Sequence, residues 1–198
     1  MVRQEKTCLS YLITRFWVNI NNADCVMVKH LTYLIVGFMG SGKSTLLQEL
    51  SSISKFPNHQ FIDLDNLIEE SELKTISEII AGSGMSYFRD LEIKYLENLL
   101  QENGKPRFIS LGGGAFNDQS DKLFSKDKNL KIIWVNTDLN ICIDRIRAEG
   151  EKRPLNRLSD EELSALHQER LKFYRKANFI YKGDTEELIA KITSSTIE

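Results

Sequence analysis

The chain has 198 residues, of which 41% are hydrophobic and 27% charged, and its formal net charge is −2. These values predict one globular domain with a sizeable core, and the near-neutral charge gives no support to a nucleic-acid partner or an anionic membrane partner. The three cysteines, Cys8, Cys25 and Cys142, are widely spaced and form no disulfide or metal-binding pattern, which favours a reducing cytosol.

The first 30 residues precede any element that we can predict, and we treat them as an N-terminal extension of unknown role. The segment Cys8–Ile20 is partly apolar, but Arg15 interrupts it and no small-residue cleavage site follows. It is therefore too short and too polar for a membrane span, and it lacks the pattern of a signal peptide. The sequence leaves open whether the protein starts at Met1 or at Met27. Residues 31–198 are predicted to form the domain.

From residue 31 onward, short apolar segments alternate with segments of helical periodicity. Five strands are predicted, at Leu31–Val36, His59–Asp63, Arg107–Leu111, Lys131–Asn136 and Asn178–Tyr181. Apolar residues recur at helical spacing in Leu91–Leu100 and, less regularly, in Leu163–Tyr174, while Ser159 and Glu162 form a capping-box pattern. This alternation indicates an α/β fold in which helices cover a mostly parallel, five-stranded sheet. In such folds, ligands bind at the carboxyl ends of the strands.

The most specific motif follows the first predicted strand, where Gly37, Gly42, Lys43 and Ser44 satisfy the pattern G-x-x-x-x-G-K-[ST]. In this motif, backbone N–H groups enclose phosphate oxygens, the lysine reaches the outer phosphates and the hydroxyl binds Mg²⁺. The helical pattern of Ser44–Ser54 adds the positive potential of a helix N-terminus. A tight strand-to-helix turn would explain the glycines but not the lysine, so we expect a nucleotide phosphate site.

Two carboxylates, Asp63 and Asp65, stand at the end of the second predicted strand. Alternate residues of a strand point the same way, so we expect both to face one cleft. There, one would help to hold Mg²⁺ and the other would accept the proton of an attacking hydroxyl. The alternative is a helix N-cap before Leu67–Glu70, because aspartate is favoured at that position for backbone reasons.

Two further segments carry charged residues or glycines at the ends of predicted elements. Arg89 lies three residues before Glu92 at the start of a helix, which fits either a surface ion pair or an arginine that its carboxylate neighbour orients towards an anionic substrate. The triplet Gly112–Gly114 ends the third strand. It indicates either a close approach of the backbone to a ligand, or a flexible or strained turn.

The polar segment 148–158 contains Lys152, Arg153 and Pro154. We predict that it is a mobile lid that carries positive charge over the phosphates, and the alternative is an ordinary solvated loop. Arg145 precedes this segment on a helix whose end is expected to reach the nucleotide base. Arg170 lies one helical turn before Tyr174 on the following helix.

In this order, the segments resemble the shikimate kinases, a small family among the P-loop proteins that are similar to nucleoside monophosphate kinases. The resemblance covers residues 31 to about 190, and it is carried by GFMGSGKST at 37–45, FIDLD at 61–65, FRDLE at 88–92, LGGG at 111–114, RPL at 153–155 and ERLKFY at 169–174. It implies a three-layer α/β/α P-loop fold with a mobile lid. It also implies ATP-dependent phosphorylation of the 3-hydroxyl of shikimate, in the synthesis of aromatic amino acid precursors. We expect a monomer in the cytoplasm.

The resemblance also implies roles for individual residues. Lys43, Asp65 and Arg153 are the implied catalytic residues, with Asp65 as the candidate base, while Ser44 is implied to bind Mg²⁺ directly and Asp63 through water. The implied ATP ligands are Gly40, Ser41, Gly42, Lys43, Ser44, Thr45, Arg145 and Arg153, where Arg145 stacks on adenine and Arg147 is the alternative for that role. The implied shikimate ligands are Asp65, Arg89, Gly113, Gly114 and Arg170, of which the two arginines clamp the carboxylate.

Several other functions stay open as alternatives. A kinase of another small metabolite, such as one similar to gluconate kinase, would keep the phosphate loop but has no need of two carboxylate-directed arginines. A nucleoside monophosphate kinase would need arginines for a second phosphate group. A GTP-dependent switch would need Asn-Lys-x-Asp, which Asn136–Leu139 lacks, and a motor-type ATPase would need paired acids where residues 112–114 are glycine. A non-catalytic nucleotide-binding protein is the last alternative, and the presence of Lys43, Ser44, Asp63, Asp65 and Arg153 together argues against it.

Overall fold

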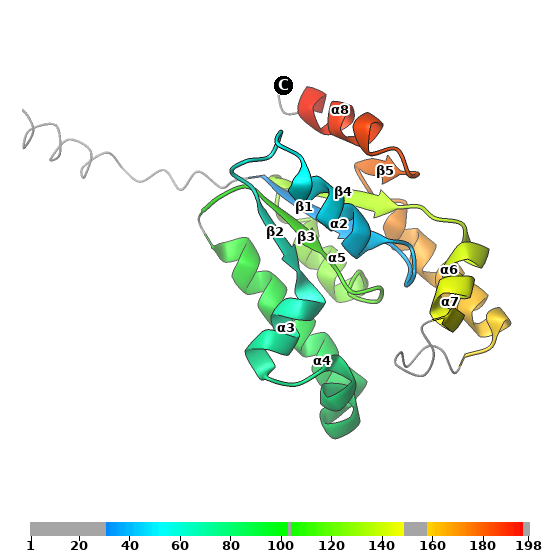
Figure 1. The fold of residues 1–198 in the computed structure, drawn as a ribbon. Helices are drawn as coiled ribbons and strands as arrows, with labels where there is room; N and C mark the ends of the chain where they lie inside the picture. Colours follow the sequence, from blue (N-terminus) through cyan, green and yellow to red (C-terminus); the bar gives the residue numbers. More distant parts are fainter. Residues whose placement is uncertain (1–30, 103, 149–157, 196–198) are drawn as a thin grey trace, which may run out of the picture.

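The structure is a computed structural model that describes residues 31–102, 104–148 and 158–195 (Figure 1). The described residues form, in chain order, β1 (Thr32–Val36), α2 (Lys43–Ser52), β2 (Gln60–Asp63), α3 (Leu64–Glu72), α4 (Ile76–Gln101), β3 (Arg107–Ser110), α5 (Asp118–Phe124), β4 (Leu130–Val135), α6 (Leu139–Ala148), α7 (Asp160–Tyr174), β5 (Phe179–Tyr181) and α8 (Thr185–Ser195). Each of the five predicted strands is confirmed, and no strand boundary differs from the predicted one by more than one residue.

The five strands form one parallel sheet in the order β2-β3-β1-β4-β5. In register, Thr32 of the central strand β1 pairs with Arg107 of β3 on one side and with Leu130 of β4 on the other. Because the strands are parallel, the segments that follow β1, β2 and β3 all leave the sheet at the same edge. The sheet therefore brings the phosphate loop, the start of α3 and the glycine triplet to one place.

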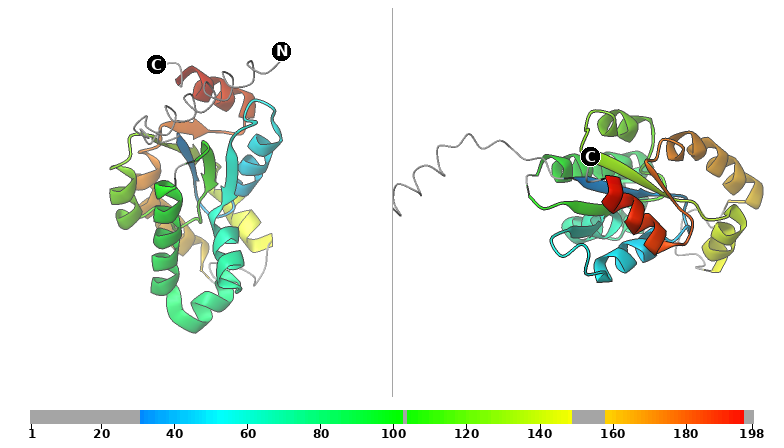
Figure 2. Two further views of the ribbon diagram at one scale, coloured as in Figure 1. Left: turned by 90° about the vertical axis from the view of Figure 1, so that its left-hand side faces the viewer. Right: turned by 90° about the horizontal axis from the view of Figure 1, so that it is seen from above.

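Helices cover both faces of the sheet, so the fold has three layers (Figures 1 and 2). All five residues of β1 are buried, as expected for a strand with both faces covered. Its side chains alternate between two cores. Tyr33 and Ile35 pack with residues of α2 and α8, whereas Leu34 and Val36 pack with residues of α3, α4, α5, α6 and α7.

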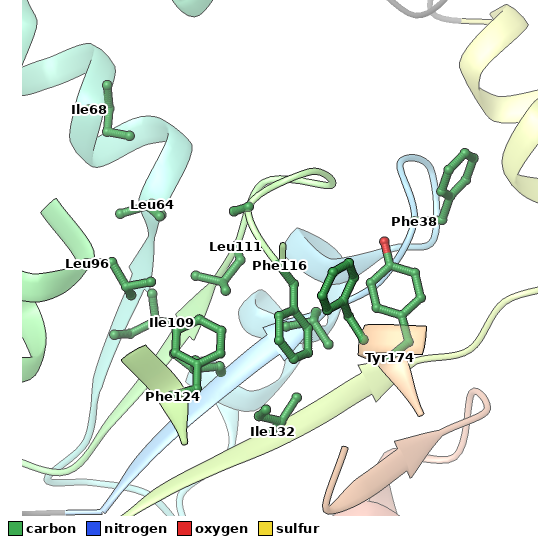
Figure 3. Packing of buried hydrophobic residues seen from close by; sticks show 14 of the residues in the cluster. Phe38, Leu64, Ile68, Leu96, Ile109, Leu111, Phe116, Phe124, Ile132 and Tyr174 are labelled. Carbon is green, nitrogen blue, oxygen red and sulfur yellow. The ribbon is translucent and has the colours of Figure 1, made fainter. Parts of the chain in front are cut away.

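The larger core holds the loop that follows β3 in place (Figure 3). Phe116, two residues after the glycine triplet, packs against Phe124 of α5 and Phe173 of α7, with ring centroids 5.2 and 5.4 Å apart. Burial of a phenylalanine side chain contributes about 1.5–3 kcal/mol, and aromatic pairs add about 0.5–1.5 kcal/mol. The glycines thus lie on a loop whose far end is anchored in the core.

The longest helix, α4, extends further towards its N-terminus than the sequence pattern predicted. It begins at a capping box formed by Thr75 and Glu78, and it is interrupted at Gly84, where φ is 85° and ψ is 166°. The break separates a first part that begins at Ile76 from the regular helix that carries Arg89. A second capping box, at Ser159 and Glu162, confirms the predicted start of α7. Within the described part of the chain, no helix is both long enough and apolar enough to cross a membrane.

Candidate active site

The phosphate loop turns from β1 into α2 through backbone conformations that require glycine. Gly40 and Gly42 have φ values of 76° and 95°, in the left-handed region that side chains disfavour. A Cβ atom at Gly40 would also lie 2.7 Å from the carbonyl oxygen of Cys142, so the loop packs closely against α6. Lys43 is the first residue of α2, and its Nζ donates to the Phe38 carbonyl oxygen at 3.0 Å. The lysine therefore folds back over the loop, where an outer phosphate would lie.

A cavity of about 820 Å³ opens on the loop, which is within the usual size range of small-molecule sites. Six predicted ATP ligands of the loop line it, namely Gly40, Ser41, Gly42, Lys43, Ser44 and Thr45, and Arg145 lines it as well. Its wall is completed by residues that the sequence did not single out: Glu49, Asn136, Thr137, Asp138, Ile141 and Tyr181–Gly183. Thr137 Oγ1 donates to the Ser41 carbonyl oxygen at 2.7 Å, which ties the loop after β4 to the phosphate loop.

Arg145 and Arg147, the two alternatives for a contact with adenine, point to different surroundings. Arg145 Nη1 donates to the Gly40 carbonyl oxygen at 2.9 Å, at the cavity wall. Arg147 Nη2 instead donates to the Leu158 carbonyl oxygen and forms an ion pair with Asp160 at 2.7 Å. Of the two arginines, only Arg145 lines the cavity of about 820 Å³.

Asp63 is both a helix cap and a neighbour of the phosphate loop. It is the last residue of β2 and the N-cap of α3, where its Oδ1 accepts from the amides of Asp65 and Asn66 at 3.1 and 3.4 Å. Its other oxygen, Oδ2, accepts from Ser44 Oγ at 2.8 Å. The predicted cap thus exists, but it stands at Asp63, and it leaves one carboxylate oxygen directed at the loop hydroxyl.

The prediction that Asp63 and Asp65 alternate along one strand is wrong. The chain becomes helical directly after Asp63, so Asp65 lies in the first turn of α3. Its carboxylate nevertheless reaches the site, because it faces the glycine triplet: a Cβ atom at Gly112 would lie 2.8 Å from Asp65 Oδ1. Burial, and secondarily the charge of Asp63, raise the pKa of Asp65, while Lys43 and Arg89 act in the opposite direction. A carboxylate with a raised pKa is a stronger base than an exposed aspartate.

A second cavity, of about 110 Å³, adjoins the phosphate loop, and all the residues that were predicted to bind the phosphate acceptor line it. It is lined by Asp65, Arg89, Gly113, Gly114 and Arg170, and also by Met39, Ile76, Ile80, Met85, Phe88, Glu92 and Gly112. Met39 belongs to the phosphate loop, and its amide nitrogen lies 3.2 Å from the position of a Cβ atom at Gly113. The two cavities therefore lie on either side of one loop.

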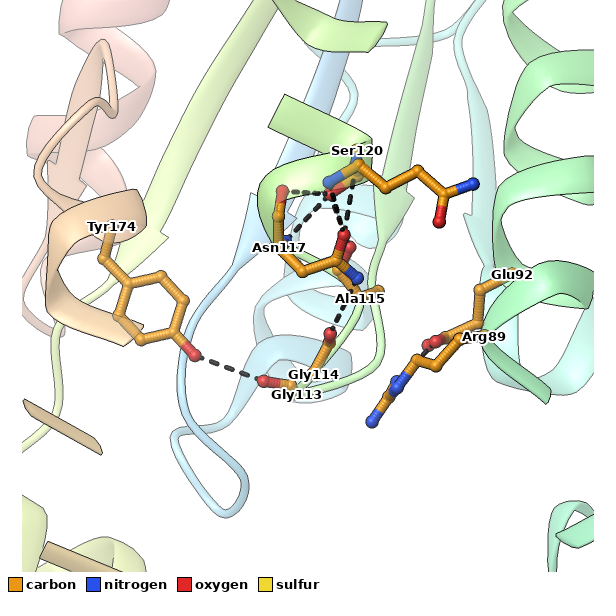
Figure 4. A network of polar contacts seen from close by, with 9 residues as sticks. Arg89, Glu92, Gly113, Gly114, Ala115, Asn117, Ser120 and Tyr174 are labelled. Atoms are coloured by element: carbon orange, nitrogen blue, oxygen red, sulfur yellow. Dashed lines mark hydrogen bonds and ion pairs between the residues drawn. The ribbon is translucent and has the colours of Figure 1, made fainter. Parts of the chain in front are cut away.

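The two arginines converge on Gly114 from different helices. A Cβ atom there would collide with Arg89 Nη2 from α4, and it would lie 3.1 Å from Arg170 Nη2 from α7. None of the three glycines has φ in the left-handed region. The triplet is therefore explained by close approach of other groups to the backbone rather than by a strained turn. Tyr174 supports this loop from the other side, since its hydroxyl donates to the Gly113 carbonyl oxygen at 3.2 Å (Figure 4).

Arg89 is held by Glu92, one turn further along α4 (Figure 4). Of the two interpretations of this pair, the surface ion pair does not hold, because the Glu92 side chain is only 2% exposed. Burial raises the pKa of Glu92 to about 7, although Arg89 opposes the shift. The arrangement matches the alternative, in which a carboxylate orients an arginine towards the cavity. Nothing in the spacing of Arg89 and Glu92 distinguished the two cases, because burial depends on the helix's neighbours.

The apolar wall of this cavity was not predicted from the sequence. Ile76 and Ile80 come from the first part of α4, and Met85 lies just after the break at Gly84. Arg153 and the predicted lid at 148–158 lie outside the described residues, apart from the two ends of that segment.

Comparisons with known proteins identify the family of this chain. The profile of the shikimate kinase family matches residues 39–198. A shikimate kinase from Sulfurihydrogenibium sp. (strain YO3AOP1) is 36% identical over 165 residues, which cover 80% of this chain and 95% of that protein. The crystal structure of shikimate kinase from Aquifex aeolicus has a TM-score of 0.68 at 30% identity and covers 84% of this chain and 96% of that one.

The fold is also that of a shikimate kinase from Acinetobacter baumannii in complex with shikimate, with a TM-score of 0.73 at 23% identity, over 85% of this chain and 96% of that chain. The family profile spans most of the chain, including the phosphate loop, Asp65, both arginines and the glycine triplet. This chain therefore belongs to the shikimate kinase family of ATP-dependent phosphotransferases.

Proposed function

We propose that the protein transfers the terminal phosphoryl group of ATP to the 3-hydroxyl of shikimate, giving shikimate 3-phosphate and ADP. The observation that carries this proposal is the second cavity, in which Arg89, Arg170 and Asp65 surround a small space beside the phosphate loop. A hydroxylated carboxylate needs such a set, because planar guanidinium groups bind a carboxylate and an acid binds hydroxyl groups.

Two arginines also favour this acceptor over neutral sugars. Burial lowers the pKa of Arg170, because the charged guanidinium is poorly solvated beside the acceptor cavity. A carboxylate would supply the missing partner, whereas a neutral acceptor would leave the guanidinium poorly paired, at a cost of about 1–3 kcal/mol. A gluconate-type acceptor also carries a carboxylate, so only a direct comparison of acceptors separates these two alternatives.

The nucleotide is proposed to occupy the larger cavity, with its phosphates on the loop at 40–45 and its base near Arg145. Lys43 would exchange its bond to the Phe38 carbonyl oxygen for a bond to an outer phosphate. In that position, it would neutralise charge that develops on the transferring group.

Ser44 and Asp63 fit a Mg²⁺ ion, because they place a hydroxyl and a carboxylate oxygen, both hard donors, 2.8 Å apart at the start of α2. The described residues contain no cluster of three or more His, Cys, Asp or Glu side chains that could hold a metal alone. This agrees with an ion that arrives with the nucleotide, since Mg²⁺ usually takes one or two protein oxygens besides phosphate and water. When bound, the ion would neutralise phosphate charge.

Asp65 is proposed to accept the proton of the attacking hydroxyl. The helix start places its carboxylate between the phosphate loop and the acceptor cavity, and both Lys43 and Arg89 act on its charge. Its raised pKa brings the base closer to the working pH, which favours proton transfer. The role of Arg153 over the transferring phosphate stays a prediction, as do the monomeric state and the cytosolic location.

An acceptor comparison tests the proposal. ADP release is measured with shikimate, gluconate, AMP or no acceptor, at equal ATP and Mg²⁺ concentrations. Shikimate should give turnover far above the rate without acceptor, and gluconate and AMP should not. Turnover of gluconate or AMP without turnover of shikimate would disprove the assignment.

A further inference from the structure

Within the part of the chain that the structure describes, one carboxylate oxygen of Glu92 is buried without a hydrogen-bond partner. Its Oε2 accepts from Arg89 Nη1, but Oε1 has no partner among the described residues, and neither has Asp65 Oδ1. A Cβ atom at Gly112 would lie 2.7 Å from Glu92 Oε1 and 2.8 Å from Asp65 Oδ1, so the two oxygens flank one point. Two buried carboxylates that face each other without a donor repel, and a proton on one of them removes the repulsion.

The charged side chains that line the acceptor cavity balance one another before an acceptor binds. In their ionised forms, Asp65 of α3 and Glu92 of α4 offset the positive charges of Arg89 and Arg170. The acceptor of the proposed function adds a carboxylate, which leaves one excess negative charge among buried groups. An uncompensated buried charge is costly, so a group with a pKa close to the ambient pH responds by changing its protonation state.

We propose that binding of the carboxylate acceptor is coupled to uptake of a proton from solvent at Glu92 Oε1. The new O–H bond points towards Asp65 Oδ1, while Oε2 continues to accept from Arg89. Glu92 is then a positioning residue with a second role: its proton balances the acceptor's charge and leaves Asp65 ionised as a base. This inference rests on the proposed function, because it requires an acceptor with a carboxylate.

The pKa of Glu92 sets the direction of the expected pH dependence. Burial raises it to about 7, and Arg89 and, more weakly, Arg170 hold it below the value that burial alone would give. An anion bound to both arginines weakens their effect, so the pKa of Glu92 rises further on binding. The affinity for the acceptor is then highest below pH 7 and falls as the pH rises above 7, by at most about tenfold per pH unit for one proton.

Other titratable groups near the cavity provide controls. Lys43, Asp63 and Glu69 shift the pKa of Asp65. His167 of α7 is the rival site of proton uptake, because burial and then Arg170 lower its pKa. An anion on Arg170 would therefore also favour protonation of His167.

Calorimetric titration of the full chain with shikimate, in buffers with different ionisation enthalpies at about pH 7.5, measures the protons taken up. With a pKa of about 7, Glu92 is already about one quarter protonated at pH 7.5 before the acceptor binds. The unmodified protein should therefore take up about one half to three quarters of a proton per acceptor, and the neutral methyl ester of shikimate should cause no uptake. Glu92→Gln should abolish the uptake and flatten the pH dependence of affinity. His167→Gln should keep the uptake, as should Glu97→Gln, which changes an exposed glutamate on the same helix.

Zero uptake by the unmodified protein would overturn the inference, and so would uptake that persists in Glu92→Gln or disappears in His167→Gln. If Glu92→Gln does not fold, ¹³C NMR of glutamate carboxyl groups in the unmodified protein decides. One resonance should titrate near pH 7 and move to a higher pKa with shikimate, and its absence would refute the proposal. Failure of shikimate to bind or react would instead count against the proposed function.

Discussion

Gly114→Ala should weaken binding of the acceptor without weakening binding of ATP. The new methyl group would collide with Arg89 Nη2 and would lie 2.8 Å from its Cζ and 3.1 Å from Arg170 Nη2. Real side chains essentially never approach a Cβ atom within 3.0 Å, so at least Arg89 must move. The φ of Gly114 is not in the left-handed region, so alanine fits the backbone and the perturbation stays local.

The size of the effect follows from the contacts that would be displaced. A hydrogen bond to a charged group contributes about 1.5–3 kcal/mol, and the arginine ends are flexible enough to keep part of it. We therefore expect a loss of about 1.4–2.7 kcal/mol, which is a rise of about 10- to 100-fold in the KM for shikimate. The KM for ATP should change less than about twofold, since Gly114 does not line the nucleotide cavity.

A coupled assay of ADP release, with each substrate varied in turn, measures both constants. Gly104→Ala is the matched control, because its methyl group would meet only the end of the Arg107 side chain, at 3.5 Å. An unchanged KM for shikimate in Gly114→Ala would show that the two arginines do not hold the acceptor. An equal rise in both KM values would point to a general distortion of the site.

Four further predictions test separate parts of the site and the fold. Lys43→Ala should abolish turnover with every acceptor while thermal unfolding shows a folded protein, and residual activity near the original rate would contradict its role at the phosphates. Arg170→Ala should raise the KM for shikimate but leave the affinity for ATP unchanged. Equal losses of affinity for shikimate and for ATP would show that Arg170 does not bind the acceptor specifically. Arg145→Ala should weaken ATP binding, as measured by calorimetry, more than Arg147→Ala does, and the reverse order would favour Arg147 as the adenine contact. Arg107→Met should lower the free energy of unfolding, measured in urea, by about 1–3 kcal/mol. The reason is that Arg107 is 3% exposed and donates to the Leu99 carbonyl oxygen near the end of α4. An unchanged free energy of unfolding would mean that this hydrogen bond does not stabilise the fold.

Much of the fold could be predicted because its signals are local in the sequence. The strand at Thr32–Val36 is a continuous apolar run, and Gly40 and Gly42 occupy backbone conformations that few other residues adopt. The capping box at Ser159 depends on residues three positions apart. By contrast, the first part of α4, from Ile76 to the break at Gly84, was not predicted. It has two glycines and no clear helical pattern, and the packing of Ile79 in the core stabilises it.

The charged residues and glycines of the site were predictable, but their environments were not. Asp65 was expected on a strand, yet it reaches the cavity from the first turn of a helix. Glu92 was weighed as a surface partner of Arg89, yet it is almost completely buried. A sequence places an ion pair on one helix face, but it does not say which neighbours cover that face.

By itself, the sequence determined that a phosphate loop follows a buried strand, and that two arginines and a glycine triplet belong to the same chain in the order typical of one kinase family. Only the tertiary structure decided that Arg89 and Arg170 meet at Gly114, and that Asp65 and Glu92 share the space beside Gly112. The physical reason is that these contacts join separate helices and a loop, which the order of the parallel strands and the packing of the core bring to one edge of the sheet.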